Sequence, residues 1–288
     1  MHKGTGLTAG SGKSMFDYHL LLLWAPLLLC LGGLSGFLAG LLGIGGGVVL
    51  VPGLFFSLTA LGFPPDHLMH VAIGTSLAII IPTGMSSARA HWKRGSVRSE
   101  LVKKIGIGIV FGVLAGTLIA GQVSGAGLNM IFAVSLVFLA GIMVADPSRF
   151  QLGDRIPPQP WPGLMGGVIG LLSSLMGIGG ATVSVPYMTV YNVPIHQAIG
   201  TAAMLGLLIS IPAAAGFALI GVGQEGLPPF SLGYVNLMAF ALVVPTAVLA
   251  APWGAAAAHR VPVGALRRVF AGFITLVAAR MLYGALLG

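Results

Sequence analysis

Hydrophobic residues occur along most of this chain in long runs that short polar segments interrupt. In the N-terminal half the apolar runs cover 18–42, 48–61, 68–90, 105–122 and 128–145, and in the C-terminal half they cover 163–176, 181–191, 196–221, 232–251 and 263–287. An α-helix needs about 20 residues to cross the hydrocarbon core of a bilayer. The pattern therefore predicts an all-α, polytopic transmembrane helical bundle. The runs 48–61, 163–176 and 181–191 are too short to cross alone.

A polar segment rich in proline and charge divides the two halves. We predict a flexible N-terminal tail over 1–17, a first transmembrane repeat over 18–145, a polar linker over 146–161 and a second transmembrane repeat over 162–288. With 56% hydrophobic and 7% charged residues, the composition agrees with a lipid bilayer as the surrounding medium.

Two motifs recur in the same order in both halves. A Gly-Ile-Gly-Gly motif occupies Gly43–Gly47 and recurs over Gly177–Ala181, and a His-x-Ala-Ile-Gly-Thr motif starts at His70 and again at His196. Because internal repeats are the usual construction of secondary transporters, the duplication favours a carrier.

Each glycine motif predicts a break between two half-helices, because glycine costs about 1 kcal/mol relative to alanine in a helix. Such a break is tolerated inside a bilayer only where protein or a water-filled cavity satisfies the freed backbone groups. The exposed N-terminus of the second half-helix carries unpaired N–H groups and a partial positive charge, which suits an anion. We therefore expect the backbone to bind a small anionic substrate at Gly45, Gly46, Gly47, Gly179, Gly180 and Ala181. The alternative, that these glycines only permit close helix packing, stays open.

Several side chains near the motifs are further candidates for substrate binding. Hydroxyl groups flank the second break or follow the His motifs, at Ser173, Ser174, Thr182, Ser184, Thr75, Ser76 and Thr201. Each hydroxyl either faces the substrate or bonds a carbonyl of its own helix. His70 and His196 either bind substrate or carry a coupling proton, or else cap or pack a re-entrant hairpin. Arg280 lies well inside an apolar run, where it either binds the anion or extends its side chain to the interface.

The basic residues gather in short loops, which bears on topology. One cluster lies within 93–104 and another within 260–268. If every broken helix crosses the membrane, the repeats are parallel and the two clusters lie on opposite sides. If each is re-entrant, the repeats are inverted and both clusters fall on the cytoplasmic side. The positive-inside rule favours the inverted arrangement.

Together with a His-Trp-Lys-Arg-Gly-Ser-Val loop over 91–97, the paired glycine and His motifs resemble the sulfite exporter (TauE/SafE) family, also called toluene-sulfonate uptake permeases. The resemblance covers nearly all of the chain after about residue 20. It implies a multi-pass permease of the cell (inner) membrane that moves sulfur oxyanions, organosulfonates or related organic anions. It fixes neither the substrate nor the direction of transport.

The expected function is a secondary permease for a small sulfur-containing anion, such as sulfite or an organosulfonate, bound near the bilayer midplane. The six acidic residues lie in loops or at helix ends, which disfavours a carboxylate proton relay and a cation pore. We expect no cofactor, no metal, no catalytic residue and no nucleic-acid partner. Alternatives are an anion channel and an intramembrane hydrolase that pairs Ser173 or Ser174 with His196. Coupling to a proton or to sodium, and a homo-oligomer, are left open.

Overall fold

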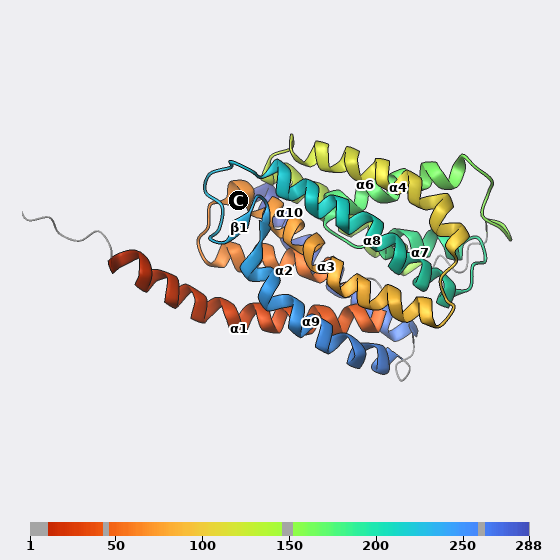
Figure 1. The fold of residues 1–288 in the computed structure, drawn as a ribbon, viewed down its shortest axis with the longest axis horizontal. Helices are drawn as coiled ribbons and strands as arrows, with labels where there is room; N and C mark the ends of the chain where they lie inside the picture. Colours follow the sequence, from red (N-terminus) through yellow and green to blue (C-terminus); the bar gives the residue numbers. More distant parts are fainter. Residues whose placement is uncertain (1–10, 43–45, 146–151, 259–262, 288) are drawn as a thin grey trace, which may run out of the picture.

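The computed structural model describes residues 11–42, 46–145, 152–258 and 263–287, and these form a helical bundle with one short β-hairpin (Figure 1). The elements are α1 Ser11–Leu42, α2 Gly47–Ala60, the 3₁₀ turn η1 Pro65–His67, α3 Leu68–Lys93, α4 Ser99–Ala120, α5 Gly125–Ala145, α6 Trp161–Met176, α7 Ala181–Thr189, α8 Ile195–Ile220, β1 Ser231–Leu232, β2 Val235–Asn236, α9 Leu237–Ala258 and α10 Val263–Leu287. The predicted tail overlaps α1, because the first helix already begins at Ser11.

Within the described residues, five helices are long and apolar enough to cross a membrane, which confirms the prediction of a polytopic α-helical membrane protein. They are Pro65–Lys93, Ser99–Ala120, Gly125–Ile142, Ile195–Ile220 and Leu237–Gly254. Shorter apolar helices include α2 and α6. The α3 span is 72% buried, against 28–44% for the other four, so α3 is the central helix of the bundle.

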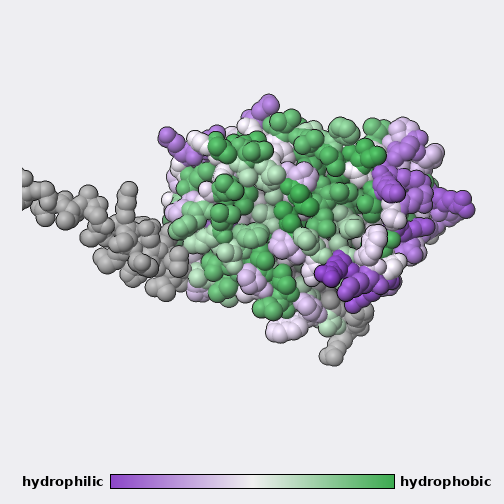
Figure 2. All heavy atoms as spheres, viewed as in Figure 1, coloured by the Kyte–Doolittle hydropathy of each residue, from purple (hydrophilic) through white to green (hydrophobic). Residues whose placement is uncertain are grey.

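One end of the bundle is rich in hydrophilic residues (Figure 2). It holds the basic connection between α3 and α4, and we call it the basic end. The Arg98 backbone N–H donates to Thr201 Oγ1 at 3.0 Å, which brings the starts of α4 and α8 together. The Leu152 N–H donates to the Val190 carbonyl at 2.9 Å, which places the end of α7 beside the polar linker.

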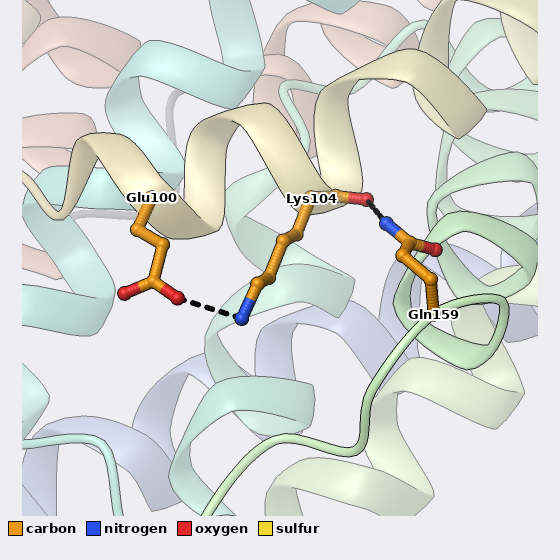
Figure 3. A network of polar contacts seen from close by, with 3 residues as sticks. All are labelled: Glu100, Lys104 and Gln159. Atoms are coloured by element: carbon orange, nitrogen blue, oxygen red, sulfur yellow. Dashed lines mark hydrogen bonds and ion pairs between the residues drawn. The ribbon is translucent and has the colours of Figure 1, made fainter.

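The linker also fixes the start of α6 at the basic end (Figure 3). Gln159 Nε2 donates to the Lys104 carbonyl at 2.9 Å, and Gln159 Oε1 accepts from the Gly163 N–H at 3.3 Å. Lys104 forms an ion pair with Glu100 at 2.6 Å, one helical turn away. That pair is solvent-exposed and adds little, so at the basic end it is the amide of Gln159 that joins the linker to α4.

The opposite end carries the β-hairpin, and we call it the β end. The two strands are antiparallel, with Ser231 opposite Asn236. The Tyr234 N–H donates to the Phe217 carbonyl at 3.2 Å, which joins the hairpin to the end of α8. His70 Nε2 lies 3.0 Å from the Ala120 carbonyl, so α3 begins where α4 ends.

The α6–α7 pair and the α1–α2 pair open towards opposite ends of the bundle. Both the start of α6 and the end of α7 are at the basic end, so this pair of helices enters and leaves there. The end of α2 instead lies near the β end, where the rings of Trp24 on α1 and Phe63 after α2 are 5.6 Å apart. From Trp24 onward, α1 and α2 therefore enter and leave at the β end.

Glycines allow two helix pairs to approach closely: α1 with α9, and α4 with α6. A Cβ at Gly36 would collide with the Ala247 carbonyl oxygen of α9. In the same way, a Cβ at Gly112 would collide with the Gly167 carbonyl oxygen of α6. Because lipid tails are as apolar as leucine, such backbone-to-backbone packing is a main source of helix association in membranes.

We expect Gly112→Ala to lower the free energy of unfolding by about 1–3 kcal/mol, since the new methyl group meets backbone that cannot rotate away. An SDS titration of the purified protein in detergent micelles measures the effect. Gly33→Ala is the matched control, because a Cβ there meets nothing within 4 Å. It should be neutral or stabilising by up to about 1 kcal/mol. Equal stability of the two variants would contradict close contact between α4 and α6.

Candidate functional site

The second glycine motif separates α6 from α7. Gly177 follows α6 with φ of 64°, a left-handed conformation that glycine adopts without strain. The Ser173 carbonyl accepts the N–H groups of both Gly177 and Ile178, so the end of α6 is closed by its own backbone. A Cβ at Gly177 would also lie 2.8 Å from Val51 Cγ2. Both the conformation and the space therefore require glycine.

The first glycine motif precedes α2. Gly45 lies outside the described residues, and Gly46 is the residue immediately before the helix. The Gly46 carbonyl accepts the N–H groups of Val49 at 3.0 Å and Leu50 at 2.9 Å. The Gly180 carbonyl likewise accepts the Ser184 N–H at 2.9 Å at the start of α7. Each motif thus leads directly into a helix N-terminus.

The two motifs are in contact with each other, although 130 positions separate them. A Cβ at Gly47 would lie 2.7 Å from the Gly177 carbonyl oxygen and 2.9 Å from Ile178 Cα. Ser76 Oγ on α3 donates to the same Gly177 carbonyl at 2.8 Å. Ile80, one turn further along α3, lies beside both Gly47 and Gly179. The central helix therefore supports both motifs on one side.

The hydroxyl groups around the second motif bond to nearby carbonyls. Ser174 Oγ donates to the Leu171 carbonyl at 3.0 Å, and Thr182 Oγ1 to the Gly179 carbonyl at 3.3 Å. Ser184 Oγ donates to the Gly180 carbonyl at 2.6 Å. Ser173 is buried, and its carbonyl closes α6 as described above. The sequence left open whether each hydroxyl faces the substrate or bonds a nearby carbonyl, and these three bond a carbonyl. Their hydrogens are therefore used, and only the lone pairs of their oxygens remain to accept a hydrogen bond.

The two His-motif threonines bind backbone of the opposite half of the chain. Thr75 Oγ1 accepts from the Asn236 N–H at 2.9 Å at the β end, and Thr201 Oγ1 accepts from the Arg98 N–H at 3.0 Å at the basic end. Asn236 and Arg98 each stand immediately before a helix, α9 and α4. The sequence reasoning missed both partners, because they carry no shared motif.

The glycine before each threonine makes room for the segment that the threonine binds. A Cβ at Gly74 would lie 2.5 Å from the Tyr234 carbonyl oxygen, and one at Gly200 would lie 2.7 Å from the Ser96 carbonyl oxygen. We call the first set, residues 74, 75, 234 and 236, the β-end contact. The second set, residues 96, 98, 200 and 201, is the basic-end contact. Each joins one half of the chain to the other.

The two motif histidines have different environments. His70 is buried, and its Nε2 lies 3.0 and 3.1 Å from the carbonyl oxygens of Ala120 and Val123. Since a carbonyl only accepts, Nε2 carries a hydrogen and ties α3 to the end of α4. His196 is exposed at the start of α8, at the basic end. The structure therefore does not bring these two residues into one site, and no hydrogen bond in the described residues joins His196 to either candidate serine.

Tyr234 of the β-hairpin completes a small aromatic cluster around His70. Its ring stacks on His70 at a centroid distance of 4.7 Å, and its hydroxyl lies 3.2 Å from His67 Nδ1. Burial raises the pKa of the Tyr234 hydroxyl, so it stays protonated at neutral pH. The cluster attaches the hairpin to the start of α3.

Arg280 is exposed on α10, with its guanidinium carbon 5.7 Å from the Phe56 ring centroid, a cation–π arrangement. Phe56 stands nine residues after Gly47 on α2, or about 13 Å along the helix axis at the usual rise. The partner of Arg280 is therefore an aromatic ring towards the end of α2.

Comparison with known proteins gives one family. The family model of the sulfite exporter TauE/SafE matches residues 28–281. A probable membrane transporter protein of Haemophilus influenzae is 38% identical over 88% of this chain and 97% of its own length. A probable membrane transporter protein of Methanocaldococcus jannaschii is 30% identical, over 81% of this chain and 85% of its own. The probable membrane transporter protein YunE of Bacillus subtilis is 26% identical, over 89% and 97%. No solved structure matches.

We expect Thr75→Val to lower the free energy of unfolding by about 1–3 kcal/mol, because it leaves the buried Asn236 N–H without an acceptor. Thr201→Val should cost less, at most about 1 kcal/mol, since the Arg98–Thr201 bond is only part-buried whereas the Asn236–Thr75 bond is buried. SDS unfolding in micelles compares the two. Thr59→Val is the control, because that hydroxyl is exposed and bonds only its own helix. A larger cost at Thr201 than at Thr75 would contradict this assignment.

Proposed function

Because the chain belongs to the sulfite exporter TauE/SafE family of membrane transporters, we propose that it is a secondary transporter for a small sulfur-containing anion, such as sulfite or an organosulfonate. The observation that carries the proposal is the contact between Gly47 and the Gly177–Ile178 turn. It places two glycine motifs, each leading into a helix, against each other inside the bundle. The substrate would bind near the bilayer midplane between them.

The chemistry of this region supports an anion. The N-terminal turns of α2 and α7 have backbone N–H groups without partners in their own helix, together with the positive end of the helix dipole. Among the acidic residues whose side chains the structure describes, Asp66 and Glu100 lie in the first turn of a helix, and Asp154 and Glu225 lie in connections. A negatively charged substrate would therefore meet donors and no buried carboxylate.

We further propose that the two halves are inverted repeats. Three observations support this: α1–α2 and α6–α7 open towards opposite ends, α1 packs on α9 as α6 packs on α4, and the β-end contact has a counterpart in the basic-end contact. Transporters built from inverted repeats bind substrate at the repeat interface and alternate access by moving one part against the other.

The two contacts suggest how access could alternate. In the proposed cycle, loosening the β-end contact opens the glycine motifs to one side while the basic-end contact stays closed, and the reverse opens them to the other side. Each contact holds its segment with a neutral hydrogen bond, which is worth only about 0.5–1.5 kcal/mol. A substrate that binds one state better than the other by that amount is enough to shift the populations.

The basic end would face the cytoplasm. It carries the positively charged connection between α3 and α4, and positively charged loops are retained on the cytoplasmic side. We propose the inner membrane of the cell as the location.

Transport is tested in proteoliposomes by sulfite and organosulfonate counterflow. We expect saturable counterflow in the wild type and at least a tenfold loss in Gly47→Ala, because the added methyl group pushes the two motifs apart. Gly33→Ala, also a helical glycine but one with free space around it, should retain the wild-type rate. Absence of flux for every anion tried would overturn the substrate proposal. Flux without counterflow would indicate a channel.

Orientation is tested by labelling single cysteines in a Cys30→Ser background. An impermeant maleimide added to spheroplasts should label Gln224→Cys at the β end and spare Ser99→Cys at the basic end. Both positions are exposed, so accessibility in the protein is matched. After the membrane is permeabilised, Ser99→Cys should label as well. Labelling of Ser99→Cys in intact spheroplasts would reverse the proposed orientation.

A further inference from the structure

A small cavity lies near the β end between α1, α2, α3 and α9. Its volume is about 10 Å³, close to what one water molecule needs. Leucine, valine and alanine residues form most of its wall, and Trp24, Ser57, Thr75 and Asn236 complete it. The cavity lies behind the β-end contact, because Thr75 and Asn236 belong to both.

Two hydrogen-bond donors beside this cavity lack an acceptor. Trp24 is 1% exposed, and its Nε1–H finds no acceptor among the residues that the structure describes. Thr75 Oγ1 accepts from the Asn236 N–H, but its own hydrogen has no acceptor in that part of the chain. A buried donor without an acceptor costs stability, so an occupant that accepts both would be favoured.

The other polar groups of the wall are either used or adaptable. The Asn236 side-chain amide donates to the Pro229 carbonyl and to Ser231 Oγ, and its oxygen accepts from the Ala239 N–H. Ser57 Oγ donates to the Gly53 carbonyl at 2.6 Å, which leaves its lone pairs free, and the hydroxyl can also rotate. The wall therefore offers two unused donors and one group that can accept or donate.

We propose that this cavity is a binding site for one small hydrogen-bond acceptor, a water molecule or a halide-size anion, held by Trp24 Nε1–H and Thr75 Oγ1–H. Ala239 in the first turn of α9 also lines the cavity, so the positive end of that helix dipole favours an electronegative occupant. No acidic residue is among the described residues that line it.

The site is separate from the proposed substrate site. A cavity with room for one water molecule is too small for sulfite, which has four heavy atoms, or for a sulfonate. An occupant would join Trp24 of α1 and Ser57 of α2 to Thr75 of α3, and so link the α1–α2 pair to the β-end contact. The occupant is therefore not the transported anion, and the existence of this site does not depend on which substrate the protein transports.

The fluorescence of Trp24 tests the proposal in the full chain, reconstituted in nanodiscs. The other three tryptophans, Trp92, Trp161 and Trp253, are 56%, 64% and 74% exposed and are replaced by phenylalanine. The emission maximum reports whether the indole N–H is hydrogen-bonded. A second measurement detects a bound anion. Sodium bromide replaces sodium gluconate at constant ionic strength, and a bromide ion bound in the cavity quenches the fluorescence of the Trp24 indole.

We expect Thr75→Val to shift the Trp24 emission to shorter wavelength and Thr75→Ser to keep the wild-type spectrum. Ser57→Ala leaves the Thr75–Asn236 bond intact and should give a smaller shift, so the proposal remains testable if Thr75→Val fails to fold. Thr59→Val, which removes a hydroxyl on the same helix α2 that is exposed and bonded to Phe55, should give no shift.

Saturable bromide quenching that Thr75→Val or Ser57→Ala weakens would identify the occupant as an anion. The same spectral shifts with only linear quenching would identify it as water. The proposal is overturned if the wild type already has the short-wavelength emission of an unbonded indole and neither variant changes it. The counterflow assay on the wild-type protein is read independently of these spectra, so a failure here is distinct from a failure of the proposed function.

Discussion

A helix that ends inside an apolar bundle leaves backbone groups that water cannot reach, and the centre of this protein is arranged to satisfy them. The Ser173 carbonyl accepts the first two N–H groups after α6, and Ser76 of α3 donates to the Gly177 carbonyl. The bond from Ser76 requires α3 to lie directly against the glycine motif. That requirement accounts for the position of α3 as the most buried of the five candidate spans.

Satisfying the backbone groups of a helix that ends inside the bundle also requires backbones to come into close contact. Gly47 can approach the Gly177–Ile178 turn only because neither side has a side chain in the way, and the α1–α9 and α4–α6 pairs rest on the same property. Lipid tails are as apolar as the helix surface, so the hydrophobic effect does not favour helix–helix contact over helix–lipid contact. Shape and close approach of the backbones therefore decide which helices pair. A methyl group at these positions changes the spacing between helices, and the spacing determines whether the two motifs meet.

The hydroxyl side chains divide into two groups with different roles. Ser174, Thr182 and Ser184 bond carbonyls three or four positions earlier in the chain, on either side of the turn between α6 and α7. Thr75 and Thr201 instead accept N–H groups from the opposite half of the chain. The first group makes only local bonds within the second half of the chain. The second group joins the halves through single hydrogen bonds, which are weak enough for a conformational change to break.

The sequence by itself determined the medium, the helical class and most helix ends. Run length and composition are local properties, and so is the low helix propensity of glycine, which located the end of α6 and the starts of α2 and α7. Thr75 and Thr201 could be picked out by their repetition. Their partners Asn236 and Arg98 could not, because those backbone N–H groups have no distinguishing side chain and lie 161 and 103 positions away. The contact of Gly47 with Gly177 and the unused Trp24 donor are likewise decided only by the tertiary structure, since each depends on how separate helices pack in space.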